Sequence, residues 1–356
     1  MDTDPIVHLP AELEPAAPAA AGQVEYITSP TLLDAFDLFI ENRKSMMLSP
    51  NTIARYQTDF KRWQRWRARG GYGARLHDIT IEELRAFFTY LREEHIQQQD
   101  NPHRPTLENQ IGLSPASIRG VWTLIHACWF FWMVEELLTD RQQGFFVRGR
   151  LPAPKVPQEI RPTYERQNIE KLIEATRKAQ NQESAARDRA AILLLYDSGM
   201  RVSELCSLND EDLDFDKRQA VITGKGDKQR WVFWTSRSSA AIREYMAVRY
   251  SDAGGPLFRG AGRGGIALKS RGKRMTSDSL RGALVRLGKR AGVELPEGAI
   301  VHALRHTFAH RFLDAGGDGL YLQQLLGHES IVTTMRYVRE NPTGLRRVYQ
   351  RAICEE

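Results

Sequence analysis

The sequence predicts a protein of two domains that is mainly α-helical and contains one small β-sheet. Its 356 residues are more than one average domain needs, and 42% of them are hydrophobic, enough to form real cores. Much of the chain repeats apolar residues every three or four positions, as amphipathic helices do, whereas residues 220–223 and 230–234 have the pattern of strands. A proline-rich stretch, residues 149–162, is typical of an extended linker between two domains.

The first 28 residues differ in composition from the rest of the chain. Residues 1–28 are rich in Ala and Pro and contain five acidic residues but no Lys or Arg, which predicts a disordered acidic tail. The remaining chain holds 50 basic and 39 acidic side chains, a net charge of +11. A basic body favours a polyanionic partner such as nucleic acid, although many basic proteins bind none.

Residues 30–148 are expected to form a helical domain of four helices joined by loops. The first helix begins near Thr31, and the third begins at Thr80 with two glutamates in its first turn, where the helix dipole favours negative charge. Ser49-Pro50 fits an N-cap followed by a proline at the first helical position. Ser114-Pro115 opens the fourth helix in the same way.

The fourth helix is expected to run to about Leu138 and carries a cluster of aromatic residues. Such a cluster more often belongs to a hydrophobic core than to a surface that stacks bases, so we interpret it as core. Its members are Trp122, Trp129, Phe130, Phe131 and Trp132.

Residues 163–350 are expected to form a mixed α/β domain, followed by a short C-terminal tail at 351–356. Its two strands flank the sequence Gly224-Lys225-Gly226-Asp227, which is typical of a β-hairpin turn and would place Lys225 at the tip. The expected helices cover residues 163–179, 187–198, 239–250, 279–291, 303–315, 320–326 and 331–338, with a further helix after Pro342.

The last quarter of the chain gathers side chains suited to a phosphodiester. His302 and Arg305 are three residues apart and share one helix face. Gly327 is a good helix terminator and would leave His328 projecting from a turn. Tyr337 follows nine residues later on another helix. Cations of this kind bind the non-bridging oxygens of a phosphate, and a phenol can act as a covalent nucleophile.

Two cations further upstream complete the set. Arg201 follows a predicted helix, and Lys225 lies in the hairpin turn. Each has a plainer alternative: Arg201 could form a salt bridge to Glu204 three residues on, and Lys225 could be a solvated turn lysine. Tyr337 taken alone would usually be a core or rim residue.

As an ordered set these residues resemble the tyrosine recombinase (phage integrase) family, and the match covers nearly all of residues 31–350. The resemblance assigns six residues to the family's two arginines, hairpin lysine, two histidines and nucleophile. They are Arg201, Lys225, His302, Arg305, His328 and Tyr337.

The resemblance implies a helical, SAM-like core-binding domain at 30–148 and an α/β tyrosine-recombinase catalytic domain at 163–350. Strand exchange would proceed through a 3′-phosphotyrosyl intermediate and a Holliday junction. The expected partners are a double-stranded DNA recombination site and three further copies of the chain, which form a homotetramer on two sites. Residues 342–356 would contact a neighbouring protomer.

Phenol is a poor nucleophile at its ordinary pKa of ~10, so the site must stabilise charge on the attacked phosphate. Arg201 and Arg305 can do so with planar, permanently charged forks. His302 and His328 are expected to hydrogen-bond the phosphoryl oxygens and could assist proton transfer, and Lys225 is the expected general acid for the 5′-oxygen.

A metal site is the competing interpretation of the histidines, because His302, His306 and His310 recur every four residues. No glutamate stands where an HExxH motif needs one, and the arginines already neutralise a phosphate. We therefore expect no metal and no cofactor, and we interpret His306 and His310 as structural supports.

Further residues are candidates for DNA contact. Lys228 and Arg230 follow the hairpin turn and could bind the DNA backbone, as could a glycine-rich basic segment with Arg263, Lys273 and Arg274. Sequence reading would fall to the N-terminal turns of the second and fourth helices, and the candidates there are Thr52, Arg55, Ser117 and Arg119.

Two other functions remain open at this point: a type IB topoisomerase-like enzyme that relaxes DNA, and a catalytically silent DNA-binding regulator. Three dispersed cysteines without a CxxC motif favour a reducing cytosol, and neither a secretory signal nor a membrane-spanning run is visible. We therefore expect a cytoplasmic protein. The sequence does not distinguish a mobile-element enzyme from one that resolves chromosome dimers.

Overall fold

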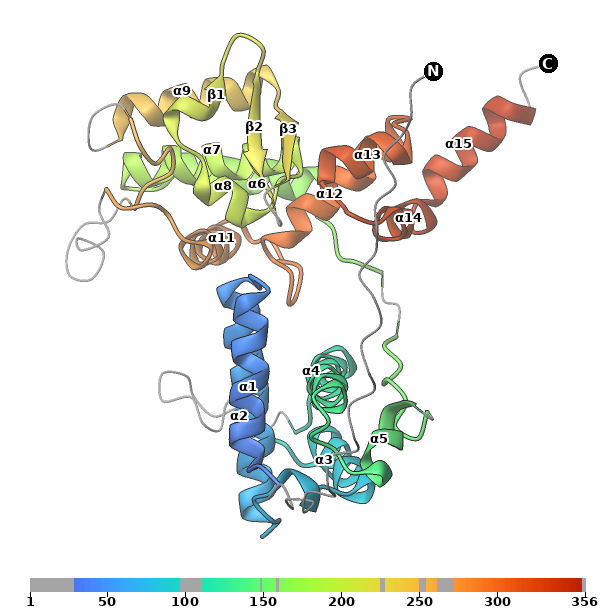
Figure 1. Cartoon of the computed structure of the whole chain (residues 1–356). Helices are drawn as coiled ribbons and strands as arrows, with labels where there is room; N and C mark the ends of the chain where they lie inside the picture. The colour runs from blue at the N-terminus through green and yellow to red at the C-terminus, as the bar shows by residue number, and fades with distance from the viewer. Residues whose placement is uncertain are drawn as a thin grey trace, which may run out of the picture. The chain divides into compact units, whose positions relative to one another are not determined.

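The computed structural model describes residues 29–96, 111–147, 149–157, 160–224, 228–249, 254–260 and 272–353. The chain divides into two compact units, Met1–Gln158 and Glu159–Glu356 (Figure 1). Within the described ranges the protein is mainly helical with one small sheet, so the predicted fold class is confirmed. The predicted acidic tail lies outside them. No helix in these ranges is long and apolar enough to cross a membrane.

The first unit contains the four predicted helices and one that was not predicted. Both serine caps are present, since Ser49 Oγ accepts from the Thr52 N–H and Ser114 Oγ from the Ser117 N–H. The fourth helix ends earlier than predicted, because Glu136 adopts a left-handed φ of 56° that no helix continues through. The elements are α1 (Leu32–Ser45), α2 (Pro50–Arg69), the 3-10 turn η1 (Leu76–Asp78), α3 (Ile81–Glu93), α4 (Pro115–Val134) and α5 (Asp140–Val147).

Aromatic side chains form the core of this unit. Trp129, Phe131 and Trp132 are buried, which confirms the core interpretation for these three members of the α4 cluster. Trp132 also donates its indole N–H to the Ala35 carbonyl at 2.8 Å, tying α4 to α1. The interpretation was wrong for Phe130, which is 56% exposed.

The second unit contains the predicted hairpin and all the predicted helices. Strands β2 and β3 pair antiparallel with Val221 opposite Trp231, and β1 extends the sheet in the order β1-β2-β3. The short elements β1 and α8 were not predicted, because two and six residues are too few to display a period. Helix α15 continues past residue 351, where the tail was expected to begin.

The elements of the second unit are α6 (Arg166–Arg177), α7 (Gln182–Ser198), α8 (Val202–Ser207), the 3-10 turn η2 (Asp210–Asp212), β1 (Leu213–Asp214), β2 (Gln219–Thr223), β3 (Gln229–Phe233), α9 (Ser236–Val248), α11 (Ser277–Ala291), α12 (His302–Asp314), α13 (Gly319–Leu326), α14 (Ile331–Arg339) and α15 (Pro342–Ile353).

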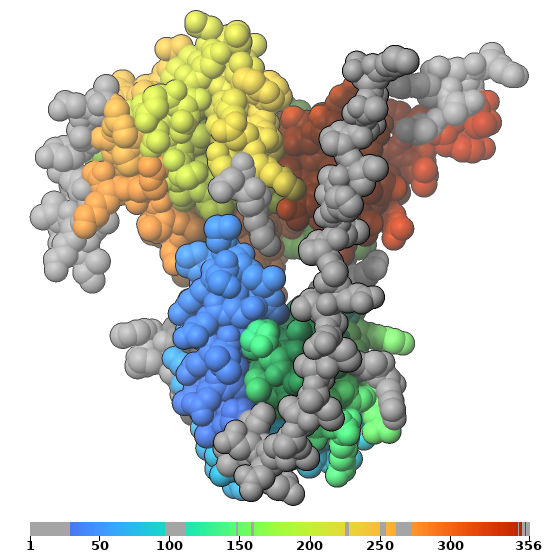
Figure 2. Space-filling view, in the orientation of Figure 1, coloured from blue at the N-terminus to red at the C-terminus, as the bar shows by residue number. Residues whose placement is uncertain are grey.

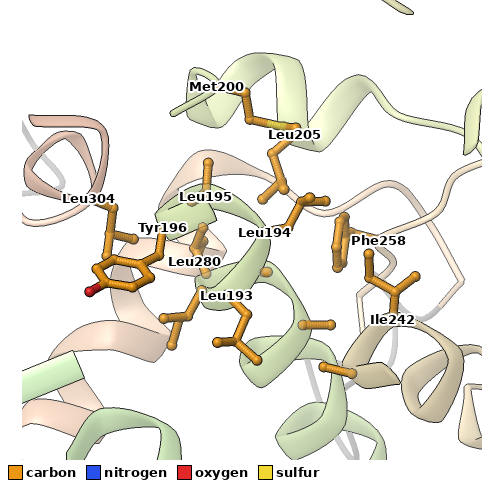
Figure 3. Close-up of a cluster of buried hydrophobic side chains, with 14 of the residues drawn as sticks. Leu193, Leu194, Leu195, Tyr196, Met200, Leu205, Ile242, Phe258, Leu280 and Leu304 are labelled. Carbon is orange, nitrogen blue, oxygen red and sulfur yellow. The ribbon is translucent and has the colours of Figure 1, made fainter. Parts of the chain in front are cut away.

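Helix α7 is the centre of this unit. Its residues are buried on every side, and it packs against α6, α9 and α12. Figure 3 shows Leu193 and Leu194 of α7 among side chains of α9, α11 and α12, including Ile242 and Leu304. Helix α7 ends at Gly199, which has the left-handed φ of 63° that glycine adopts without strain. A buried helix therefore fixes the place where the chain turns toward Arg201.

Alanine at position 199 is predicted to destabilise the protein more than alanine at 292. Both glycines have a φ of 63°, but a Cβ at Gly199 would lie 2.2 Å from Cδ1 of Phe308, whereas a Cβ at Gly292 meets nothing within 4 Å. Gly292→Ala should cost about 1 kcal/mol from backbone strain alone. Gly199→Ala should cost a further ~1–3 kcal/mol from overpacking. Urea unfolding of both variants measures the difference, and equal losses would contradict the close approach.

Candidate active site

Three neighbouring helices bring the C-terminal set together. Helix α12 carries His302, Arg305 and His306, and α14 carries Tyr337. Between them, Gly327 ends α13 with a left-handed φ of 62°, as predicted, and His328 follows it directly. Because these helices pack against one another, side chains about 30 residues apart in the sequence converge.

Tyr337 is the centre of the cluster and only 1% of it is exposed. Its phenolic oxygen accepts a hydrogen bond from Arg161 Nη1 at 2.9 Å and lies 2.8 Å from His306 Nδ1. Its ring stacks on His328, with centroids 6.2 Å apart, and meets the edge of His310 at 5.8 Å. The phenol is therefore held in one orientation by groups on all sides.

Arg305 is buried and its guanidinium is fixed by the carbonyl groups at two helix ends. One amino group donates to the Gly199 carbonyl at 2.8 Å, and the other donates to the Leu326 carbonyl at 2.7 Å. Both carbonyls belong to C-terminal turns, whose partial negative charge favours a cation. Burial and nearby Arg201 lower the pKa of Arg305 to about 10, so the side chain stays charged near neutral pH.

His328 is held between Arg305 and Thr334. Its Nε2 accepts from Arg305 Nη2 at 3.1 Å, so its Nδ1 carries the hydrogen and donates to Thr334 Oγ1 at 2.8 Å. Burial, with Arg305 and Arg201 nearby, lowers the pKa of His328 to about 4. This imidazole is therefore neutral near pH 7.

The other histidines of the site are also favoured in the neutral form. Burial, followed by the charge of Arg161, lowers the pKa of His306 to about 3. Burial and Arg305 lower the pKa of His302. Positive charge in this cluster therefore comes from the arginines.

Arg201 is the N-cap residue of α8, and its side chain is 31% exposed. Its Nη1 donates to Glu204 Oε1 at 2.9 Å, so the predicted salt bridge is present. Nη2 reaches the Gly327 carbonyl at 3.4 Å, which links Arg201 to the turn before His328. The two arginines Arg201 and Arg305 thus meet at the C-terminal end of α13.

Glu204 is buried and links Arg201 to a second arginine, Arg230. Both of its oxygens accept from Arg230, at 2.8 Å each, and Arg230 Nε donates to the Leu325 carbonyl. Burial alone would raise the pKa of Glu204, but the hydrogen bonds from Arg230 and Arg201 outweigh it and lower the pKa. The predicted DNA contact of Arg230 needs correction, because its guanidinium is buried in this ion pair. Arg230 positions Arg201 through Glu204.

The other predicted DNA contacts in the second unit have different surroundings. Lys228 is largely exposed and lies 3.4 Å from Glu329, and Lys273 is exposed. Arg274 is exposed, and its guanidinium donates to two backbone carbonyls, those of Cys206 and Leu208. Lys225 and Arg263 lie outside the described residues.

The four candidates in the first unit all lie within the first two turns of two helices. Thr52 and Arg55 are on α2, and Ser117 and Arg119 are on α4. Arg55, Ser117 and Arg119 are exposed, and Arg119 donates to the Pro154 carbonyl at 3.0 Å. These residues are near helix N-termini, where backbone N–H groups favour phosphate.

Two contacts of the phenol were missed by reasoning from sequence. His306 was expected to be a structural support, yet it lies on the phenolic oxygen itself. Its position four residues after His302, on the same helix face, could have indicated this. Arg161 gave no signal, because its partner is 176 residues away. Within the described ranges, no three His, Cys, Asp or Glu residues are grouped as a metal site would require.

A buried phenol beside fixed guanidinium groups and neutral imidazoles defines a site suited to binding a phosphate. The phage integrase family model matches residues 163–343. The tyrosine recombinase XerC of Roseiflexus castenholzii is 30% identical over 302 residues, 83% of this chain and 84% of the relative. Tyrosine recombinase XerA of Thermococcus kodakarensis is 30% identical over 308 residues, 85% and 90% of the two chains. The chain belongs to the phage integrase family of tyrosine recombinases.

Solved structures share the fold. The Tn1549 transposon integrase in complex with transposon right end DNA has a TM-score of 0.66 at 18% identity, covering 91% of this chain and 99% of that chain. A lambda integrase dimer bound to a COC′ core site has a TM-score of 0.63 at 16% identity, covering 86% and 95%. At these identities the likeness concerns the fold, and it agrees with the predicted fold class.

Replacing Glu204 by Gln is predicted to destabilise the protein by about 3 kcal/mol at neutral pH, since it leaves the buried guanidinium of Arg230 without a counter-charge. Because the folded pKa of Glu204 is lowered, its contribution is present above the ordinary carboxyl pKa and is lost as the pH falls through the folded value. The gap between wild type and variant should therefore narrow on acidification, as measured by urea unfolding.

The control for this experiment is Glu170→Gln. Glu170 also receives two hydrogen bonds from one arginine, Arg237, but both side chains are about half exposed. An exposed pair contributes at most about 1 kcal/mol. A Glu204→Gln loss no larger than that of the control would contradict a supporting role for the buried pair.

Proposed function

We propose that this protein is a site-specific DNA recombinase in which Tyr337 attacks a backbone phosphate and forms a 3′-phosphotyrosyl bond. The observation that carries the proposal is the phenol itself. Arg161 and His306 hydrogen-bond to its oxygen, and its ring stacks on His328, which accepts a hydrogen bond from Arg305. A nucleophile fixed beside permanent positive charge is the arrangement that attack on an anionic phosphodiester requires.

Each member of the set has a role in the reaction. Arg201 and Arg305 bind the non-bridging oxygens, and Arg305 has no freedom to turn away because two backbone carbonyls hold it. His302 hydrogen-bonds the same phosphoryl group, and His328 joins it by the tautomer that carries its hydrogen on Nε2, once phosphate has replaced the contact of that nitrogen with Arg305. A phosphate oxygen would compete with His328 Nε2 for the Arg305 N–H, which couples phosphate binding to this contact.

The chemistry consists of two transesterifications. The Tyr337 oxygen bonds to phosphorus, the bond from phosphorus to the 5′-oxygen breaks, and Lys225 gives its proton to that oxygen. The 5′-hydroxyl of a second duplex then attacks the phosphotyrosyl bond and restores the phenol. One phosphodiester is exchanged for another at each stage, so the reaction needs no ATP, metal or other cofactor.

Both units take part in DNA binding under this proposal. The helical unit is the core-binding domain, residues 30–148, and the second unit is the catalytic domain, residues 163–350. The DNA-bound integrase structures that share the fold support a duplex as the ligand. Contacts are proposed at Thr52, Arg55, Ser117, Arg119, Lys228 and Lys273, which keep polar or charged groups near the surface.

The C-terminal helix supplies a contact between protomers. Leu345, Tyr349 and Ile353 are spaced by four residues, share one face of α15 and are 59–71% exposed. An apolar stripe of this kind is typical of amphipathic helices that bind in a hydrophobic groove of a partner. We propose that this stripe binds to a groove on the second unit of another copy of the chain. Such contacts would join four protomers on two sites and permit a Holliday junction.

A groove of the required character lies between β3 and α13 in the same unit. It has a volume of about 1390 Å³, and exposed aromatic residues line it, including Trp231, Phe233 and Tyr321. Figure 2 shows the hairpin strands (yellow) adjoining the C-terminal helices (red) on this face. Its lining also includes Arg201 and His328, so a helix bound in the groove would lie beside two residues of the proposed active site.

The nucleophile can be tested with suicide substrates. Nicked duplexes with randomised arms lose the fragment beside the nick after cleavage, so the covalent adduct persists in denaturing gels and its DNA identifies the target. Wild type should form adduct and Tyr337→Phe should form none, since phenylalanine has no attacking oxygen. Tyr72→Phe, which alters an exposed phenol of the first unit, is the control and should behave as wild type.

Other outcomes favour other functions. Adduct formed by Tyr337→Phe would contradict the assigned nucleophile. Absence of adduct with wild type, despite DNA binding, would favour a silent regulator. Relaxation of supercoils without junctions from paired sites would favour a type IB topoisomerase-like enzyme.

Charge on the α15 stripe should separate cleavage from strand exchange. The double variant Leu345→Asp/Tyr349→Asp should retain adduct formation on single sites but reduce junction yield from paired sites at least tenfold, roughly the effect of removing two anchors of an interface. Gln350→Asp places one negative charge on the same helix outside the stripe and should leave the yield unchanged. Junction yield equal to wild type in the double variant would contradict docking by this face.

A further inference from the structure

Arg161 lies in the predicted linker, residues 149–162, and its side chain contacts the proposed nucleophile. It lies at the start of the second unit, which begins at Glu159, and its partner Tyr337 is 176 residues away in the sequence. Its Nη1 donates to the phenolic oxygen at 2.9 Å, and its guanidinium carbon is 5.0 Å from the centre of the ring. Hydrogen bonding and charge therefore act on the same phenol.

The direction of the hydrogen bonds follows from the chemistry of the two neighbours. A guanidinium has donors and no acceptor, so Arg161 must donate to the phenolic oxygen. The phenolic hydrogen is then directed to His306 Nδ1 at 2.8 Å, and His306 must be the tautomer with its hydrogen on Nε2. Donor, phenol and acceptor thus form a chain in which the proton points away from the arginine.

We propose that Arg161 and His306 are catalytic residues that act on the nucleophile: His306 Nδ1 accepts the phenolic proton, and Arg161 stabilises the phenolate. The inference rests on the proposed function, because it needs Tyr337 to be the attacking group. As the phenolic O–H bond breaks, its proton bonds to Nδ1, and the oxygen's electron pair forms the bond to phosphorus. The 5′-oxygen leaves with a proton from Lys225. In the second step the attacking 5′-hydroxyl gives its proton to Lys225, and the imidazolium returns its proton to the departing phenolate.

The surroundings of His306 suit an acceptor. The ring is buried, and burial together with nearby Arg161 keeps the pKa of His306 at about 3, so its Nδ1 lone pair is free at neutral pH. His302 meets His306 edge-on at 5.7 Å, and His310 faces the same phenol. An imidazolium formed there is a strong acid because of the positive charge nearby, and this favours return of its proton to the phenolate in the second step.

The role of His306 differs from those of His302 and His328, which are assigned to the phosphoryl oxygens. His328 stacks on the phenol ring with its nitrogen atoms bonded to Arg305 and Thr334. Of the histidines that contact Tyr337, His306 is the one with a hydrogen bond to its oxygen among the described residues.

The test measures the rate of adduct formation with full-length protein saturating a nicked duplex carrying the recovered target sequence. Arg161→Ala should slow adduct formation by about 10²-fold, the usual effect of removing one donor from a developing anion. Arg161→Lys should recover part of the rate, because an ammonium keeps the charge but not the fork. Millimolar guanidinium should accelerate Arg161→Ala and leave wild type unchanged, which loss of a merely structural residue would not produce.

The control is Arg166→Ala, which removes an exposed arginine five residues along and should cleave at the wild-type rate. His306→Gly should be slowed to a similar degree as Arg161→Ala and should be accelerated by added imidazole. Tyr337→Phe, run in parallel, separates the two levels of the hypothesis. If it forms no adduct while Arg161→Ala and His306→Gly cleave as wild type does, the inference fails and the proposed nucleophile stands. Faster cleavage by Arg161→Ala would also overturn the inference, by making Arg161 a restraint.

Discussion

The site depends on the fixation of one buried guanidinium by backbone carbonyl groups. Arg305 donates to Gly199 at the end of α7 and to Leu326 at the end of α13, and it also holds His328. A buried cation is costly unless its donors are satisfied, so this position requires both helix ends to stop where they do. The two stops are left-handed glycines, Gly199 and Gly327. Core packing of α7 thus determines where positive charge stands in the site.

A second consequence concerns the protonation states around the phenol. Arg161, Arg201 and Arg305 remain charged, and together with burial they disfavour charge on the neighbouring imidazoles. Neutral imidazoles can accept as well as donate hydrogen bonds, whereas charged ones can only donate. The division of labour is therefore physical: arginines supply constant charge, and histidines supply proton acceptors and orientation. Glu204 holds Arg201 in place with Arg230 behind it, without neutralising Arg305 directly.

The features predicted correctly from the sequence are those governed by local interactions. Ser49 and Ser114 cap their helices within three residues, Gly327 ends α13, and the hairpin strands pair across a short turn. Such signals lie within a few neighbouring residues, and the ordered motif adds the expected identity of the site. Helix α5 and strand β1 were missed because short elements display little periodicity.

Contacts between distant segments could not be predicted in the same way. Arg230 was expected on DNA, yet its partners are 26 and 95 residues away, on α8 and α13, and only the fold brings them to β3. Arg161 lies in a proline-rich segment with no periodicity, and its contact with Tyr337 spans 176 residues. A charged side chain in a linker or turn looks solvated in the sequence, and its burial becomes evident once the fold places a carboxylate, carbonyl or phenol beside it.

The most direct test of the central claim is to locate the covalent bond. Adduct trapped on the recovered target site can be digested with nuclease and protease, and the peptide that carries the nucleotide can be sequenced by mass spectrometry. The account predicts a 3′-phosphonucleotide on the oxygen of Tyr337, in the α14 peptide. A nucleotide bonded to any residue other than Tyr337 would contradict it.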